Sequence, residues 1–162
     1  MSRPLGQSRD AVVPPREATA YAEDYFAWVQ DQVALLRAGR RDQLDLDNLA
    51  EEVGDLGNSV KREIASRLEV LLCHLLKWQF QPAHQSNSWK ATIIEQRRRI
   101  LHELATSPSL KGYPAKVLDE EYETARLKAS GETHLSESVF PHDCPFAIAD
   151  ILDPDFFPEA EA

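Results

Sequence analysis

Two neighbouring stretches decide the fold: HLLKWQFQP, residues 74–82, and SWKATIIEQRRRI, residues 88–100. Apolar residues recur at steps of three and four on both sides of the intervening turn, which is the spacing of one helix face. Pro82 cannot continue a helix interior, and Ser86 or Ser88 can cap a new helix. The pattern therefore predicts two long antiparallel helices joined by a tight turn.

The first helix of this hairpin is predicted to begin after Asp45 or Asp47 and to end before Pro82. Gly54 and Gly57 interrupt it, and each costs about 1 kcal/mol relative to Ala in a helix interior. The apolar stripe keeps its phase across both glycines, so we predict one continuous helix with a single core-facing stripe. The stripe comprises Leu46, Leu49, Val53, Leu56, Val60, Ile64, Leu68, Leu71, Leu72, Leu75 and Trp78.

Further helices are predicted on either side of the hairpin. One starts near Thr19 and ends about Arg37, and another runs from about Tyr113 to Ser130 with Gly131 as its C-cap. The tail is too apolar to stay in water, so it must lie on the helices; its large side chains are Phe140, Phe146, Ile148, Ile151, Leu152, Phe156 and Phe157. We predict an all-α fold, an up-and-down helical bundle of about four helices with an ordered C-terminal wrap.

Composition sets the domain count and the compartment. A chain of 162 residues, 43% of them hydrophobic, can form one core without metal or disulfide support. We therefore expect a disordered N-terminal arm at residues 1–17 and one helical-bundle domain at residues 18–162. The N-terminal residues lack the apolar core of a signal peptide, and no apolar run reaches the roughly 20 residues that span a bilayer. We expect a cytoplasmic protein with no membrane contact.

The net charge of −9 hides a segregation of charge along the chain. Residues 1–60 have a net charge of −5, residues 61–111 of +5, and residues 112–162 of −9. Acidic total charge argues against sequence-independent binding of nucleic acid, which depends on an excess of Lys and Arg. The basic middle segment either neutralises its acidic neighbours across helix contacts or forms a local anion-binding face.

The chain resembles a bacterial family catalogued as domain of unknown function twenty-nine. The resemblance covers residues 21–158 and is specific because its motifs are long and keep their order. These motifs are YFAW (25–28), NLAEE (48–52), HLLKWQ (74–79), SW (88–89), EQR (95–97), FPHDCPF (140–146) and DPDFFP (153–158). The resemblance implies an all-helical fold in the bacterial cytoplasm, and it supplies no catalytic residue, substrate or cofactor.

The sequence predicts neither a metal site nor a cofactor site. A dinuclear carboxylate site in a helical bundle needs Glu-x-x-His motifs, and no histidine of this chain has a glutamate three residues before it. Glu51, Glu52 and Asp55 could bind a hard cation, but acidic residues near a helix N-terminus also suit the helix dipole. Cys73 and Cys144 have no CxxC spacing for zinc or redox chemistry.

Two groups of residues could carry function on the hairpin. His74 should lie opposite the segment of Glu95, Gln96 and Arg97, where the four side chains form a polar network that fixes helix register. Alternatively, His74, Glu95 and Arg97 form an acid–base group. Arg97 follows the apolar positions of its helix, so we expect it to be buried and paired with a carboxylate.

The second group lies at the end of the hairpin. Lys77, Trp78, Trp89 and Lys90 combine cations with aromatic rings, a combination that binds single-stranded nucleic acid and other polyanions. Both tryptophans are also in phase with the apolar stripes, so packing explains them without a ligand. The leading hypothesis is a non-enzymatic module that binds another protein. Polyanion binding through the hairpin and an enzyme using a His/Glu/Arg group are the alternatives, and association with a second copy of the chain stays open.

Overall fold

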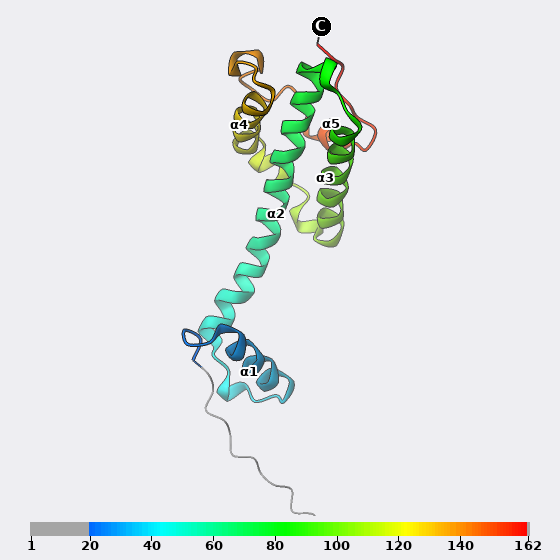
Figure 1. Ribbon diagram of the computed structural model, residues 1–162. Coiled ribbons are helices and arrows are strands. Elements are labelled where there is room, and N and C mark those ends of the chain that lie inside the picture. Colours follow the sequence, from blue (N-terminus) through cyan, green and yellow to red (C-terminus); the bar gives the residue numbers. More distant parts are fainter. Residues whose placement is uncertain (1–19, 162) are drawn as a thin grey trace, which may run out of the picture. The chain divides into compact units, whose positions relative to one another are not determined.

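A computed structural model describes residues 20–161 of the chain. The described residues form helices and no strand, and helix α2 packs with both α3 and α4, which confirms the predicted all-α fold with an ordered C-terminal segment (Figure 1). By its contacts the described part of the chain divides into two compact units, residues 20–53 and 54–161. The predicted arm, residues 1–17, lies outside the described residues, and the single domain from residue 18 to 162 stays a prediction.

The first unit consists of helix α1 (Tyr25–Arg37), a 3₁₀ turn η1 (Arg41–Gln43) and the beginning of helix α2 (Leu46–Phe80). Helix α1 starts at Tyr25 and not near Thr19, because the Asp24 side chain accepts a hydrogen bond from the Ala27 N–H and caps the helix there. Gly39 takes a left-handed conformation, φ 71°, just after the helix end.

Trp28 and Gln32 are the buried side chains of α1, each 2% exposed. Both contact Asp45, the residue before α2. The indole N–H of Trp28 donates to the Asp45 carboxylate at 3.1 Å, and the Asp45 backbone N–H donates to the Gln32 side-chain oxygen at 2.9 Å. The same carboxylate accepts from the backbone N–H of Asn48 at 3.4 Å and so caps α2. One acid thus joins the two helices of this unit.

The second unit is built on a hairpin of α2 and α3 (Asn87–Thr106), joined through the 3₁₀ turn η2 (Pro82–His84). Helix α2 is continuous through Gly54 and Gly57, as predicted. The Ser86 hydroxyl accepts from the Trp89 N–H and caps α3. The core of the hairpin lies on the predicted stripes, with fully buried residues Ile64, Leu68, Leu71, Leu72, Leu75, Ile93 and Ile100, and Leu76, which was not predicted, is fully buried as well.

Helix α4 (Tyr113–Thr133) follows the 3₁₀ turn η3 (Pro108–Leu110) and packs on α2, so that α2, α3 and α4 run up, down and up (Figure 1). The predicted end at Gly131 is wrong. The helix continues to Thr133, whose hydroxyl donates to the Ala129 carbonyl, and His134 takes the left-handed C-cap conformation at φ 60°. The Ser130 hydroxyl donates to the Leu135 carbonyl and fixes the exit of the chain.

The C-terminal segment contains a 3₁₀ turn η4 (Glu137–Val139) and a short helix α5 (Ile148–Leu152) that contacts both α3 and α4. Phe140, Phe146 and Ile151 are buried in the common core. The Phe157 ring packs against Trp78, with 5.1 Å between ring centroids, and the Glu161 N–H donates to the Gln79 carbonyl. The segment therefore lies across the hairpin, as its apolar content predicts.

Candidate functional site

The first part of the predicted stripe, Leu46, Leu49, Val53 and Leu56, is here called the α2 apolar face. Its exposure to solvent is the feature that the sequence did not predict. Leu46, Val53 and Leu56 are 65%, 65% and 68% exposed, whereas the same stripe is fully buried from Ile64 to Leu75. Steps of three and four residues place the face within about 80° of the helix circumference. The expectation that the whole stripe faces the core is therefore wrong for its first three turns.

Two carboxylates border the α2 apolar face, those of Glu52 on α2 and of Asp45, the residue before the helix. Glu52 accepts hydrogen bonds from the hydroxyls of Tyr21 at 2.6 Å and Tyr25 at 2.8 Å, and Asp45 accepts from the Asn48 amide at 2.7 Å and from Trp28. These hydrogen bonds lower the pKa of both acids. The bond from Tyr21 is the largest cause for Glu52, and the bond from Asn48 is the largest cause for Asp45. Both carboxylates are thus held in place and ionised at neutral pH.

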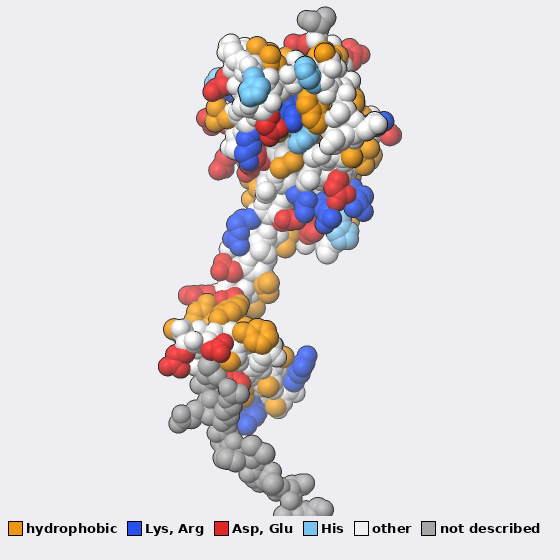
Figure 2. Space-filling view, in the orientation of Figure 1, with side chains coloured by type: hydrophobic (Ala, Val, Ile, Leu, Met, Phe, Trp, Pro, Cys, Tyr) orange, Lys and Arg blue, Asp and Glu red, His pale blue; other side chains and the backbone are white. Residues whose placement is uncertain are grey.

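Exposed aromatic side chains of α1 add to the apolar surface of the first unit. Phe26 is 71% exposed and Tyr25 is 51% exposed. Figure 2 shows hydrophobic side chains gathered over α1 and the beginning of α2. On the opposite flank of the α2 apolar face stand Ala50 and Gly57, and a Cβ atom added at Gly57 would meet no atom within 4 Å. The helix backbone is therefore open to close approach on that side.

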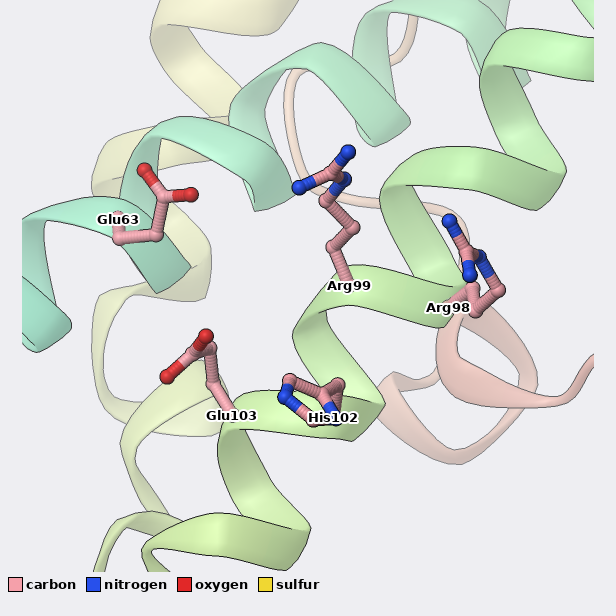
Figure 3. Close-up of a pocket in the computed structure, with 5 residues that line it drawn as sticks. All are labelled: Glu63, Arg98, Arg99, His102 and Glu103. Atoms are coloured by element: carbon pink, nitrogen blue, oxygen red, sulfur yellow. The ribbon is translucent and has the colours of Figure 1, made fainter.

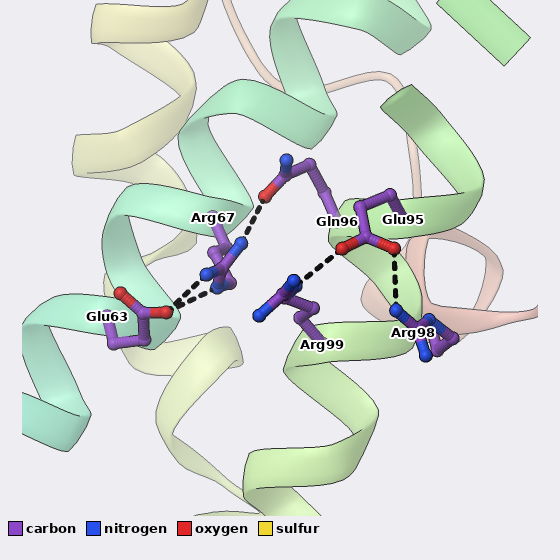
Figure 4. A network of polar contacts seen from close by, with 6 residues as sticks. All are labelled: Glu63, Arg67, Glu95, Gln96, Arg98 and Arg99. Atoms are coloured by element: carbon purple, nitrogen blue, oxygen red, sulfur yellow. Dashed lines mark hydrogen bonds and ion pairs between the residues drawn. The ribbon is translucent and has the colours of Figure 1, made fainter. Parts of the chain in front are cut away.

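The four residues of the predicted polar network bond elsewhere in the structure. The His74 Nδ1 lies 2.9 Å from the Val70 carbonyl, so it carries the proton and donates within its own helix. Burial, and after it the charge of Lys77, lowers the pKa of His74. Gln96 accepts from Arg67 of α2 at 2.9 Å, which is a cross-link between the two hairpin helices (Figure 4).

Glu95 belongs to a surface cluster on α3. It accepts from Arg98 at 2.8 Å and from Arg99, and these bonds, Arg99 first, lower the pKa of Glu95 to about 2 (Figure 4). With Glu63 and His102, the two arginines also line a hollow of about 280 Å³, to which α2 contributes Glu63 and α3 the rest (Figure 3). Glu95 pairs with both arginines, and Glu63 and Glu103 add negative charge to the lining, so the hollow offers no free anion site.

Arg97 is 1% exposed, as its spacing predicts, but its partner is not a carboxylate. Its guanidinium donates to three backbone carbonyls of the C-terminal segment, those of Ile151 at 2.8 Å, Pro154 at 3.2 Å and Phe156 at 2.9 Å. Burial lowers the pKa of Arg97, and the nearby carboxylates of the segment oppose that effect. Arg97 is therefore the residue that fastens the segment to α3.

The residues at the end of the hairpin are largely engaged with the fold. Lys77 is 5% exposed, and its ammonium group lies 2.5 Å from a Glu132 carboxylate oxygen and 4.5 Å from the Trp89 ring centroid. Lys90 is exposed and stands over Phe157 at 5.9 Å. Of the two lysines expected to contact a polyanion, only Lys90 faces solvent.

A short Cys-His-Asp grouping lies where the C-terminal segment meets α4. His142 and Asp143 are paired at 2.8 Å, and Cys144 follows them. The Cys144 thiol points to the Phe146 carbonyl at 3.5 Å, and burial raises the pKa of this thiol. A protonated thiol directed at a carbonyl is not an activated nucleophile.

Residues 20–157 match the sequence profile of the family described as domain of unknown function DUF29. The chain belongs to this family. A search of curated proteins and a search of solved structures each found no similar protein. Within the part of this DUF29 chain that the structure describes, no helix could cross a membrane, and no cluster of three or more His, Cys, Asp or Glu residues could hold a metal ion.

Proposed function

We propose that this DUF29 protein is a cytoplasmic, non-enzymatic helical module that binds another protein through the α2 apolar face. The observation that carries the proposal is the exposure of Leu46, Val53 and Leu56, each about two-thirds open to solvent on one face of one helix. Contiguous exposed apolar side chains at helical spacing are typical of surfaces that dock a partner helix.

Burial of the α2 apolar face by a partner is favoured in free energy over its exposure to water. Fully burying a Leu or Val side chain contributes about 1.5–3 kcal/mol, so three such positions can supply several kcal/mol to a complex before the cost of association. Gly54 and Gly57 lower the stability of the free helix by about 1 kcal/mol each relative to Ala. A Cβ atom at either glycine would meet nothing within 4 Å in the isolated chain, so internal packing gives no reason for them. A partner packed closely on the α2 apolar face would supply that reason for Gly57, which borders the face.

The proposal is tested by site-specific photo-crosslinking in the native host. A photoreactive amino acid is placed at Val53 or Leu56 on the α2 apolar face, and at Asn58 or Arg62 on the opposite side of the same helix as matched controls. All four positions are exposed, so none of the replacements disturbs the core. We expect one defined protein adduct from the two face positions and none from the controls.

Absence of an adduct at the face positions, or the same adducts at face and control positions, would contradict the proposal. Nucleic acid crosslinked at either site would favour the polyanion alternative instead. Circular dichroism of the purified variants checks that their helical content equals that of the parent.

A further inference from the structure

The α2 apolar face has the pattern of a two-heptad coiled-coil seam. Leu46 and Val53 are separated by seven residues and occupy one seam position, and Leu49 and Leu56 occupy the other; Val60 continues the spacing but packs against the core of the second unit. Leu49 and Val60 are half-buried and the other three are exposed. A seam of this kind accepts one partner helix that lies along it.

The flanking positions of a coiled coil decide which partner is accepted. Glu52 occupies one flank, with Asp45 just before the helix on the same side, and Ala50 and Gly57 occupy the other flank. Both acids have lowered pKa values and are fixed by hydrogen bonds from the first unit, so they present permanent negative charge beside the seam. Over residues 45–55 the chain carries five acidic residues and no Lys or Arg.

A second copy of the chain does not fit this pattern. In a parallel pair, Asp45 and Glu52 would face the uncharged residues Ala50 and Gly57 of the other copy and would gain no cationic partner. In an antiparallel pair, the two Glu52 carboxylates would approach each other. Like charges that meet across a coiled coil oppose association. A helix with Lys or Arg at its flanking positions would instead form an ion pair with each acid and bring its backbone close to Ala50 and Gly57.

We infer that the partner of the α2 apolar face is a basic amphipathic helix of another protein, which lies along the seam with its cations on Asp45 and Glu52. The inference rests on the proposed function and names the class of its partner. Charge and apolar contact have separate roles. The leucines and the valine of the face supply affinity, and the two acids select a partner helix of positive charge.

Peptide binding to the full chain tests this inference. The probe is a fluorescently labelled synthetic helix of three heptads with Leu at the seam positions and Lys at the flanking positions, and its comparison peptide has Glu at the flanking positions. We expect the Lys peptide to bind at least about tenfold more tightly than the Glu peptide at low salt, a preference that shrinks at about 500 mM salt because screening weakens exposed charge pairs.

Variants of the chain separate the two roles. Val53→Asp with Leu56→Asp should abolish binding of the Lys peptide. Glu52→Gln, which keeps an acceptor for the tyrosine hydroxyls, should reduce the preference several-fold. Leu127→Asp is the matched control because Leu127 is an exposed apolar residue of α4, 48% exposed, and it should bind like the parent. Circular dichroism verifies the fold of each variant.

Four outcomes overturn the inference. Equal binding of the two peptides, or equal loss in the Leu127→Asp control, would show that charge selection or the site is wrong. A dimer of the parent that Val53→Asp dissociates would make a second copy the occupant. Lys-peptide binding that appears only after deletion of residues 1–19 would make that segment the occupant. A defined adduct from Val53 in the host, together with equal peptide binding, would contradict only the basic helix and leave the proposed function standing.

Discussion

Replacement of Arg97 by Met should release the C-terminal segment from α3. Met preserves most of the buried volume, so the change removes mainly the three hydrogen bonds to the carbonyls of Ile151, Pro154 and Phe156. Removing the donor from a buried carbonyl costs about 1–3 kcal/mol, because the group is left without a partner. The Ile151 bond is buried, whereas the other two are part-buried and water can replace the donor there.

The energies of these three hydrogen bonds set the expected loss of stability. About 2 kcal/mol for the Ile151 carbonyl and about 0.5 kcal/mol for each of the others give a loss of about 3 kcal/mol in the free energy of unfolding. Relief of the desolvated guanidinium charge acts in the opposite direction, so this value is an upper estimate. Arg97→Lys should recover only part of the loss, since one ammonium group cannot span three carbonyls as a planar guanidinium does.

The assay is urea unfolding followed by tryptophan fluorescence in a Trp28→Phe background. In that background the signal comes from Trp78 and Trp89, which both belong to the hairpin. Limited proteolysis gives a second measure, and the segment should be cut faster in Arg97→Met than in the parent. Unfolding free energies that agree within about 0.5 kcal/mol, together with equal cleavage rates, would refute the role assigned to Arg97.

Three further predictions concern the pKa of His74, the reactivity of the two cysteines and the binding of nucleic acid. Burial lowers the pKa of His74 in the folded protein. Below about pH 6.5 the unfolded chain therefore binds a proton at His74 more readily than the folded chain does. The free energy of unfolding should fall as the pH falls below this value. His74→Gln should make this fall smaller in urea titrations between about pH 7.5 and 5.5. Burial raises the pKa of the Cys73 thiol to about 12 and also raises that of Cys144, so at about pH 8 a thiol reagent should react slowly with Cys144 and not at all with Cys73 until the protein is unfolded. Finally, the parent should not retain nucleic acid even at about 50 mM salt; retention that Lys90→Glu removes would contradict this and revive the polyanion alternative.

The sequence predicted the helices and the core because periodicity reports both directly. The stripe of Ile64, Leu68 and Leu71 is fully buried, and α3 presents Ile93 and Ile100 to it. Helix ends were less predictable, since several residues of each boundary are able to cap. Asp24 begins α1 where Thr19 was expected, and His134 ends α4 where Gly131 was expected.

The candidate sites were predicted less well, for a different reason. Spacing placed Arg97 in the interior, but its partners are backbone carbonyls, which leave no mark in the sequence. Periodicity also assigns Leu46, Val53 and Leu56 to the stripe without telling whether another element packs on them. The acidic residues around them, together with the two glycines, were the signal that distinguishes this part of the stripe from the buried part.

The central claim is that the α2 apolar face binds a protein, and quantitative co-purification from the native host tests it most directly. The parent, Val53→Asp with Leu56→Asp, and Leu127→Asp are purified in parallel after nuclease treatment. The account predicts a protein recovered in stoichiometric amount with the parent and with Leu127→Asp, and lost from the double variant. Recovery of the same proteins with all three chains, or loss of the partner on nuclease treatment, would contradict it.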